Sequence, residues 1–567
     1  MKKHRIAVLA GLTALSLAAV TLLSACSPSA EGIVTEPNRK DLVLASGQTA
    51  QAVIVVPENA SEKVTAAAAD LQDYLKRMTG AEFTVRTDAE ETGDGPRILV
   101  GPTRQTLALG IGTFKAYPED ERILVRREGS DLILCGNDDG NFTGTQFAVT
   151  RFLEECGCAW FAEDDLWTVV PELKTLAVGT MNIEHTARFT YRMLYRVPEG
   201  LLSRWYQGGE KVHVGHGVGE QLIGKSAYDT YPEWFALVNG SRDPSAEGIQ
   251  YWQFCYTNES LAQAVAKKVI KIFDENPDMT TYSVASNDGW EKNWCSCDTC
   301  TAMGSDTDEM ILFANRIAEI VCQKYPDRRI SILSYHSTYT VPVSGIQAHP
   351  NVDVMFCLET SLFLPLKQES TVLNGYNSTT HNTYTQSWAG NFREYIQKAG
   401  VKNVSIWGWY LPEGGRAEWS NVPWVQGKAM TDNLDLFEEN GVTHVFYDVF
   451  GIYPELRWPL WYVSAKAMWD GSKDGNTLLR EACDKLFGAA SEDMFNYYMA
   501  LADSAAKCDA TSSVAWVPPT LFEAYWDTAA GGYAESARAK KDQLTDVEWQ
   551  RVEKQLYYWG VTRMKLG

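Results

Sequence analysis

The segment from Ser283 to Cys300, SVASNDGWEKNWCSCDTC, carries the side chains best suited to chemistry in this 567-residue chain. The residues from Thr280 to Ser286 predict a buried strand, and Asn287, Asp288 and Trp290 follow it. In (β/α)8 barrels the catalytic groups lie at the carboxyl ends of the strands. A carboxyl group there can protonate a glycosidic oxygen, and an indole offers an apolar face to a sugar ring. We therefore expect Asp288 to be a proton donor, with Asn287 and Trp290 binding substrate beside it.

Hydrolysis of a glycosidic bond also needs a second carboxylate, which acts as a base or as a nucleophile. Glu359 directly follows the predicted strand VDVMFCL and is the expected second group. Glu413 lies in the loop after the next predicted strand, and Asp448 follows the last one. We expect these two acids to hydrogen-bond sugar hydroxyls. The alternative for each is a solvated surface acid, which is common in a chain with 72 acidic residues.

Further polar and aromatic residues lie at predicted strand ends and would complete a substrate-binding rim. The expected members are His213, His216, His336, Trp409 and Tyr410. A histidine at a rim can equally be a structural hydrogen-bonding group. Trp407 on the same strand as Trp409 is either a stacking surface or a plug that fills the barrel.

Cys295, Cys297 and Cys300 have the C-x-C-x-x-C spacing of metal ligands, and Cys255 ends a strand predicted to be their neighbour. Four thiolates that converge on zinc would form a closed structural site and hold the catalytic loop in place. The alternative is a disulfide with one free thiol. No cofactor is expected for catalysis, and zinc in this cluster would not be catalytic, because a fully Cys-ligated ion has no open coordination position.

The N-terminus has the pattern of an export signal, with Lys2, Lys3 and Arg5 preceding an apolar run and the sequence LSAC. Residues 1–25 are expected to be a lipoprotein signal peptide, and Cys26 the lipidated residue. Two acyl chains would anchor the protein to the bacterial cell membrane on its extracellular side, with residues 26–41 as the linker. An uncleaved membrane anchor is the alternative, because the apolar run approaches spanning length.

Composition narrows the classes of partner. The formal net charge of −21 disfavours nucleic acid, because binding to phosphates needs a basic surface. The 19 tryptophans and 26 tyrosines provide rings of the kind that carbohydrate sites use, so a carbohydrate is the expected substrate. The octapeptide GEQLIGKS at residues 219–226 fits a P-loop pattern, but Pro232 and the polar residues after Lys225 argue against the helix that a P-loop requires.

Periodicity divides the mature chain into three parts. Residues 42–186 predict a small α+β domain, with an amphipathic helix from Ser61 to Met78 that Gly80 ends. Residues 187–457 alternate strands and helices, which indicates an α/β fold with a (β/α)8 TIM barrel. Residues 458–567 read as a helical C-terminal region. The eight strands expected for the barrel are 189–196, 212–217, 253–256, 280–286, 329–335, 352–358, 404–409 and 444–448.

Several motifs resemble known families. "ILVGPT" and "GNFTGTQFAVTRFLEECGCAWF" resemble the small domain that precedes the barrel in family 20 hexosaminidases and family 67 α-glucuronidases. "YPEWFALVNGSR", "FCYTNESL", "SNDGW…CSCDTC" and "YVSAKAMWDGSKDGNTLLREACDKLFGAA" resemble domain-of-unknown-function family 4838, a bacterial glycoside-hydrolase-like barrel. The resemblance covers most of residues 42–510 and implies a carbohydrate-active enzyme.

One departure from the hexosaminidase pattern affects the expected mechanism. Family 20 enzymes carry an adjacent Asp-Glu pair after the fourth strand, whereas this chain has Asn287-Asp288. Substrate-assisted chemistry therefore does not carry over. We expect a glycoside hydrolase that acts on oligosaccharide or host-glycan chains at the cell surface through a carboxylate pair. The alternative is a non-catalytic carbohydrate-binding lipoprotein.

Overall fold

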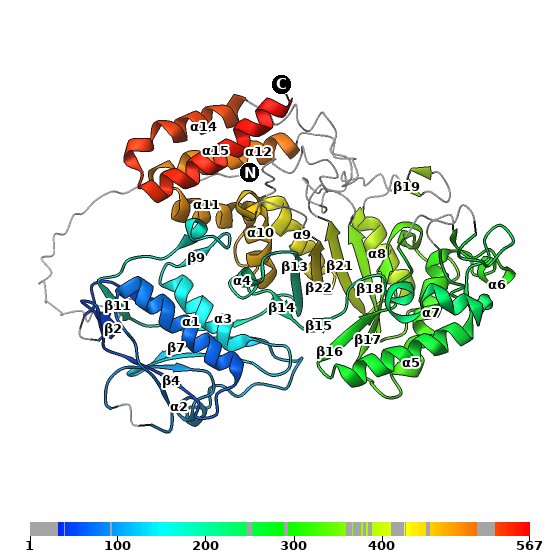
Figure 1. Cartoon of the computed structure of the whole chain (residues 1–567), viewed down its shortest axis with the longest axis horizontal. Helices are drawn as coiled ribbons and strands as arrows, with labels where there is room; N and C mark the ends of the chain where they lie inside the picture. Colours follow the sequence, from blue (N-terminus) through cyan, green and yellow to red (C-terminus); the bar gives the residue numbers. More distant parts are fainter. Residues whose placement is uncertain are drawn as a thin grey trace, which may run out of the picture.

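The structure is a computed structural model with three parts that follow one another along the chain (Figure 1). It describes residues 32–38, 40–90, 93–246, 252–288, 293–358, 366, 376–377, 382–383, 388–409, 425, 427–448, 454–506 and 528–566. No helix within these ranges has the length and apolar character needed to cross a bilayer.

The first part is built on a six-stranded sheet with two long helices on one face (Figure 1). The strand order is β12 (Asn182–Thr186), β7 (Arg122–Glu128), β8 (Asp131–Gly136), β6 (Arg97–Val100), β4 (Val53–Val56) and β5 (Val85–Thr87). Helices α1 (Glu62–Thr79) and α3 (Gly144–Glu155) cover it, because alternate strand residues such as Ile54 and Ile98 share a core with Leu71 and Phe152. The same part contains a second sheet of four strands. Its order is β1 (Ile33–Val34), β11 (Thr175–Val178), β2 (Leu42–Ser46) and β3 (Thr49–Ala50).

The ends of α1 follow directly from the sequence. Ser61 accepts a hydrogen bond from the Val64 backbone N–H at 3.3 Å, which satisfies one of the free donors of the first turn. Gly80 ends the helix at a φ of 71°, a conformation in which a side chain is disfavoured. The predicted start and end of this helix are confirmed.

The second part is a nearly closed eight-stranded barrel, and the predicted fold class is confirmed (Figure 1). Seven strands run parallel in the order β13, β22, β21, β18, β17, β16 and β15, and the two-residue β14 pairs antiparallel with β13. Their bounds are Tyr191–Tyr195 (β13), Gly208–Gly209 (β14), Lys211–Val212 (β15), Met279–Ser283 (β16), Arg329–Ser334 (β17), Val352–Leu358 (β18), Asn403–Trp409 (β21) and Val442–Asp448 (β22). Among the described residues, β14 and β15 end the order without pairing to each other.

The prediction that residues 253–256 form the third barrel strand is wrong. In the structure β15 pairs directly with β16, and Phe254 makes only an isolated bridge with Phe235. The segment is held through its side chains, because the Tyr256 hydroxyl donates to Gln253 Oε1 at 2.7 Å and Gln253 in turn binds the backbone of Asn287. It is therefore part of the long connection from β15 to the next helix.

Amphipathic helices cover the outside of the barrel. They are α5 (Glu259–Glu275), α7 (Asp306–Val321), α8 (Trp388–Ala399) and α9 (Lys428–Glu439). Each turns a stripe of buried residues toward the strands, such as Val265 and Val269 of α5. After β17 the described chain forms only the short 3-10 helix His336–Tyr339 before β18 begins.

A buried polar network closes the barrel at the amino ends of its strands. Arg329 forms an ion pair with Glu210, and His444 lies 3.5 Å from Glu210 Oε2 and 3.5 Å from Asp353 Oδ2. Ser405 donates to Asp353 at 2.7 Å. Because charges are placed in a low-dielectric interior only when paired, these side chains form one unit. The opposite end of the barrel is left for a site.

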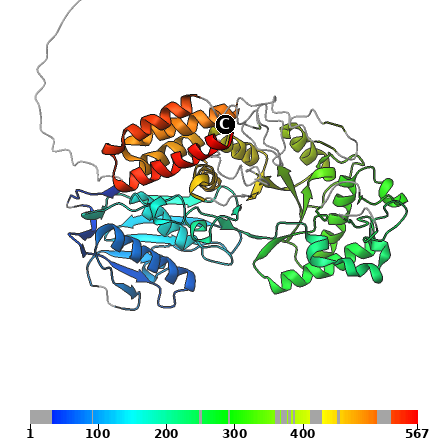
Figure 2. The ribbon, with the colours of Figure 1, turned by 45° about the horizontal axis from the view of Figure 1, so that its top comes forward.

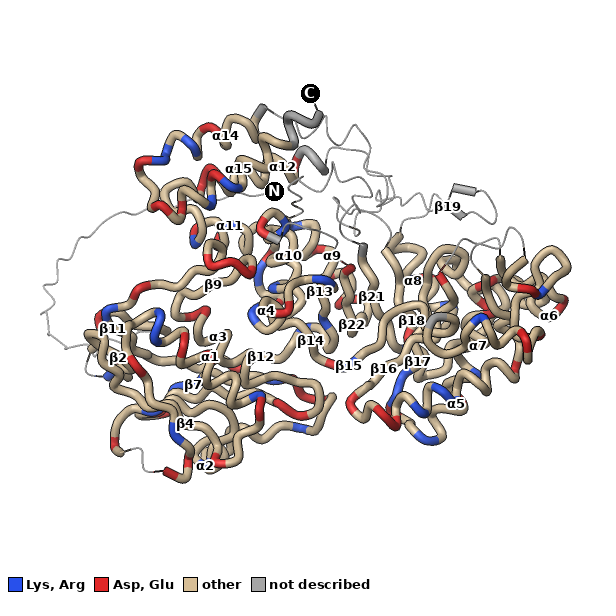
Figure 3. The backbone as a smooth tube through the Cα atoms, viewed as in Figure 1, with Lys and Arg blue, Asp and Glu red and all other residues tan. Residues whose placement is uncertain are grey.

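The third part is helical and rests on both of the others. Helices α10 (Pro454–Trp469), α11 (Gly475–Leu486), α12 (Ser491–Ala506), α14 (Thr528–Ala539) and α15 (Asp546–Leu566) lie above the N-terminal part in both views (Figures 1 and 2). Arg551 of α15 donates to the Leu166 backbone, which ties the last helix to the first part. Acidic and basic residues are interspersed over the described tube (Figure 3).

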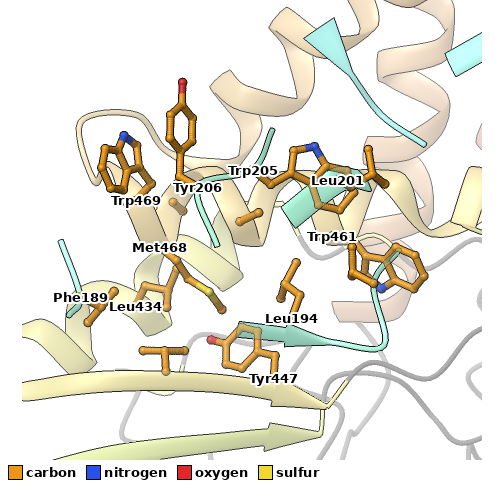
Figure 4. Packing of buried hydrophobic residues seen from close by; sticks show 14 of the residues in the cluster. Phe189, Leu194, Leu201, Trp205, Tyr206, Leu434, Tyr447, Trp461, Met468 and Trp469 are labelled. Carbon is orange, nitrogen blue, oxygen red and sulfur yellow. The ribbon is translucent and has the colours of Figure 1, made fainter. Parts of the chain in front are cut away.

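Helix α10 joins the helical part to the barrel through large buried side chains (Figure 4). Trp461 and Met468 of this helix face Leu194 and Tyr447 of the barrel strands. Trp469 stacks on Tyr206 with ring centroids 4.7 Å apart. Each such side chain contributes about 1.5–3 kcal/mol by leaving water, so the barrel and the C-terminal helices share one core.

Candidate active site

A pocket of about 130 Å³ opens at the carboxyl ends of the barrel strands. Its described lining is His216, Asp288, Leu333, Tyr335, Cys357, Leu358 and Trp407. The lining residues come from the ends of β17, β18 and β21 and from the segments after β15 and β16. The pocket therefore lies at the end of the barrel where the active sites of such barrels lie.

His216 and Asp288 face each other at this pocket. His216 Nε2 lies 3.7 Å from Asp288 Oδ1, and His216 Nδ1 lies 2.7 Å from the Ser286 carbonyl oxygen. Because a carbonyl only accepts, Nδ1 carries the hydrogen in this contact. In the neutral imidazole Nε2 then has a free lone pair, and this nitrogen faces the Asp288 carboxyl group. Only 14% of the His216 side chain is exposed, whereas 57% of the Asp288 side chain is.

His336 lies within electrostatic reach of both residues. Burial lowers the pKa of His336 below its ordinary value; Asp288 opposes this shift and His216 adds to it. The residue has a φ of 49°, a left-handed conformation that costs energy for a side chain other than glycine. His336 therefore brings a second, neutral imidazole close to the same carboxylate.

Aromatic rings form the apolar wall of the pocket. The Tyr335 ring centroid is 5.8 Å from that of His216, and the Trp407 ring centroid is 6.4 Å from it. Trp407 also packs edge-on against Phe446 inside the barrel at 5.1 Å. Its indole Nε1 is buried without a hydrogen-bond partner among the described residues. Trp407 thus fills the barrel and lines the pocket at once, which combines the two alternatives inferred from the sequence.

Asn287 is held in place by hydrogen bonds to Trp252 and Gln253. Its amide Nδ2 donates to the Trp252 carbonyl at 2.8 Å, and its backbone N–H donates to Gln253 Oε1 at 3.2 Å. Gln253 Nε2 donates back to the Asn287 carbonyl at 2.7 Å. A Cβ on Gly219 would collide with the Asn287 side chain, which explains the glycine there. These contacts fix the backbone immediately before Asp288.

The P-loop pattern that contains Gly219 does not form a P-loop. Lys225–Asp229 is a single 3-10 turn, not the long helix whose N-terminus binds phosphate in such motifs. This agrees with the expectation from the residues that follow Lys225.

His213 and Asp448 are placed differently from His216. His213 stacks on Tyr282 with ring centroids 4.2 Å apart, and burial lowers its pKa while Gln221 opposes the shift. It does not line the pocket. Asp448 ends β22, two residues after the inward-facing Phe446, so it lies on the same face of the strand. Its carboxylate is 4.0 Å from Arg196 Nε.

Several predicted site residues fall outside the described residues. They are Cys26, Trp290, Glu359, Tyr410 and Glu413. Trp409 ends β21, but its side chain is not described. The proposed roles of these residues stay predictions from the sequence.

The four predicted metal ligands lie together. The sulfur atoms of Cys255, Cys295, Cys297 and Cys300 are all within 4.8 Å of one another. Cys255 Sγ is 3.8 Å from Cys297 Sγ and 3.7 Å from Cys300 Sγ. A disulfide bond is about 2.05 Å long, so these cysteines are free thiols in the structure. Cys255 reaches the cluster from the segment before α5, not from a barrel strand.

Some residues that shape the site were not singled out from the sequence. Tyr335 continues the inward alternation of β17 after Leu333, and Cys357 does the same in β18, so period-2 spacing carried a usable signal. No local signal existed for Gln253, because its hydrogen bond to the Asn287 backbone joins segments 34 residues apart. The network around Glu210 and His444 likewise depends on strand register alone.

No curated protein matches this sequence. Three similar solved structures are a family 89 glycoside hydrolase from Clostridium perfringens in complex with PUGNAc (9% identity, TM-score 0.48, covering 90% of this chain and 63% of that chain), CpGH84B (10%, 0.47, 94% and 90%) and a Streptomyces plicatus N-acetyl-beta-hexosaminidase in complex with Thio-NAglucal (11%, 0.42, 80% and 92%).

At these identities and TM-scores the similarities assign no activity to this chain. The match to a family model, in contrast, identifies the family of this chain. The model described as "Domain of unknown function (DUF4838)" matches residues 165–500, which is 336 of the 567 residues. Because the match spans more than half of the chain, this protein belongs to the DUF4838 family.

Proposed function

We propose that the protein is a glycoside hydrolase whose proton donor is Asp288. The observation that carries the proposal is the pocket at the carboxyl ends of the strands, where Asp288 meets His216 beside the rings of Tyr335 and Trp407. Glycosidic hydrolysis uses a protonated carboxyl group together with a second carboxylate, and Asp288 is proposed as the first of these. An indole or phenol ring can stack on a sugar while the carboxyl group reaches the leaving oxygen.

The His216–Asp288 contact can accommodate a proton on Asp288. With Nδ1 committed to the Ser286 carbonyl, a neutral His216 presents only an acceptor to the carboxyl group. A protonated Asp288 can donate to that acceptor, whereas an ionised one cannot. Contacts of this kind are often long without substrate and shorten when it binds.

The proposed partner of Asp288 is Glu359, as base or nucleophile. The residue before it, Leu358, lines the pocket, and Glu359 itself is outside the described residues. Asp448 and Glu413 are proposed to bind sugar hydroxyls. The proposed substrates are oligosaccharide or host-glycan chains, met at the bacterial surface where the lipidated Cys26 would hold the protein.

A second candidate, a non-catalytic carbohydrate-binding protein, is favoured by one observation. Asp288 is the one carboxylate among the described residues that line the pocket, and Asn287 beside it is engaged by Trp252 and Gln253. A pocket with rings and a single acid can bind a sugar without cleaving it.

The two candidates are separated by measuring turnover and binding on the same protein. The purified chain is screened against aryl glycosides and glycan mixtures, and the sugars that interact are titrated by calorimetry. Hydrolysis that depends on Asp288 supports the proposed enzyme. Heat of binding without any released sugar would establish the binding protein instead.

A further inference from the structure

The four-cysteine cluster beside the pocket has the dimensions of a metal site. A tetrahedral zinc ion with Zn–S bonds of about 2.3 Å places its sulfur ligands about 3.8 Å apart. Cys255 Sγ lies 3.8 Å from Cys297 Sγ and 3.7 Å from Cys300 Sγ, and every pair in the cluster is within 4.8 Å. The four sulfur atoms therefore have the spacing of a tetrahedral zinc site and are too far apart for disulfides.

Hydrogen-bond donors point at these sulfur atoms. The Leu237 backbone N–H donates to Cys295 Sγ at 3.3 Å, and the Arg242 guanidinium lies 3.9 Å from the same sulfur. The Thr257 hydroxyl lies 3.1 Å from Cys300 Sγ. Four thiolates around Zn²⁺ carry a net charge of −2, and donors of this kind stabilise that charge. Apolar packing alone would not require them.

The cysteines lie where two segments with little regular structure meet. Segments 252–258 and 293–301 carry the sulfur atoms and a third segment, 235–242, packs on them; their regular structure amounts to two isolated bridges and short helical turns. Phe235, Phe254 and Tyr256 anchor these segments in the main core, whereas the cysteines pack in a small separate cluster with Ala236, Leu237 and Val238. So small a cluster does little to hold the sulfur atoms together, and a cross-link there would stabilise the contact between the two segments.

We propose that Cys255, Cys295, Cys297 and Cys300 bind one structural Zn²⁺ ion. All four coordination positions are taken by protein, so the ion has no place for water or substrate and acts by joining segments 252–258 and 293–301. It would hold, at Cys295, the C-terminal end of the segment that carries Asn287 and Asp288.

The site also connects to the pocket through Gln253, two residues before Cys255. Gln253 makes two hydrogen bonds to the backbone of Asn287, at 2.7 and 3.2 Å, and Asp288 is the next residue. Zinc bound at Cys255 would therefore hold the proposed acid in position. This role of zinc in positioning Asp288 rests on the proposed glycoside hydrolase activity, whereas the zinc site itself does not.

The zinc site is tested on the purified full-length chain by elemental analysis and thiol counting. One zinc per chain is expected. Cys297→Ser should weaken zinc binding by more than about 100-fold in competition with a chromophoric chelator, beyond the usual effect of a changed outer-shell group. Cys322→Ser is the matched control, because Cys322 is a half-buried free cysteine outside the cluster. Cobalt substituted for zinc should give thiolate-to-metal absorption in the wild type and in Cys322→Ser.

Absence of stoichiometric zinc from protein prepared with zinc and reductant, or a native disulfide among the four cysteines, overturns the site. Zinc measurements need no activity, so a protein with one zinc and no hydrolysis keeps the site and removes the proposed enzyme. Gln253→Ala leaves all four ligands in place and should keep zinc while kcat falls more than KM rises. Unchanged kcat in Gln253→Ala would remove the positioning role.

Discussion

His216 Nε2 and Asp288 Oδ1 lie 3.7 Å apart, on segments that are more than 70 residues distant in the sequence. The Ser286 carbonyl fixes the imidazole so that its free nitrogen faces the carboxyl group. This relationship gives Asp288 a defined proton partner at the mouth of the barrel, and the first two predictions follow from it.

Asp288→Asn should lower turnover by about 10²- to 10⁴-fold, because an amide cannot supply the acid proton. The loss should be smallest with aryl glycosides whose leaving group departs without protonation. Steady-state kinetics across a series of leaving groups measures this. Asp327→Asn is the control, since Asp327 is an exposed acid just before β17, at the opposite end of the barrel. A uniform loss across all leaving groups would remove Asp288 as the acid.

His216→Gln should lower kcat/KM by roughly two- to tenfold, the value of a hydrogen bond of about 0.5–1.5 kcal/mol between neutral groups. Because His216 acts through Asp288, the double variant with Asp288→Asn should be little worse than Asp288→Asn alone. His349→Gln, before β18 at the far end of the barrel, provides the control. Fully additive losses would show that the two residues act independently.

Glu210→Gln should destabilise the fold by about 3–5 kcal/mol at neutral pH, because it leaves Arg329 and His444 without their buried partner. Urea unfolding followed by circular dichroism measures the change. Glu58→Gln removes an exposed ion pair with Arg104 and should change stability by less than about 0.5 kcal/mol. Equal effects of the two substitutions would contradict the role of the network.

Glu210 also makes the stability of the fold depend on pH. Burial alone raises the pKa of Glu210, but His444 and Arg329 outweigh it, so the pKa lies well below its ordinary value. The unfolded chain then binds this proton more readily than the folded one. The contribution to stability is present at neutral pH and is lost as the pH falls below about 4.3 toward the folded pKa. Acid titrations of stability should therefore be shallower for Glu210→Gln than for the wild type.

Gly219→Ala should impair the site without affecting the N-terminal part, because the new methyl group would displace Asn287 and with it Asp288. Gly224→Ala is the matched control, since its Cβ would meet only Ser226 Oγ at an ordinary 3.7 Å. A crystal structure or kinetic comparison of the two variants checks the expectation. Equal activity of both would show that the Asn287 contact does not position the acid.

Local chemistry was enough for much of the fold. Ser61 and Gly80 act within one turn of their own helix, and the short, largely buried runs of β17, β18 and β22 are visible over a few residues. Six of the eight predicted barrel strands correspond to strands of the structure for that reason, whereas the predicted strand 212–217 overlaps β15 only at Val212. Residues 253–256 show where such reasoning fails, because an apolar run bonded through Gln253 resembles a strand locally.

Most of the elements, the end of the barrel at which Asp288 lies and the set of cysteines proposed to bind metal could be predicted from the sequence. Tertiary structure alone decided that His216 rather than His213 faces Asp288, and that Glu210, His444 and Arg329 meet inside the barrel. The physical reason is the distance along the chain over which each interaction acts. Capping and periodicity act between neighbours in the chain, whereas these contacts depend on strand register and barrel closure, which the packing of the whole core sets.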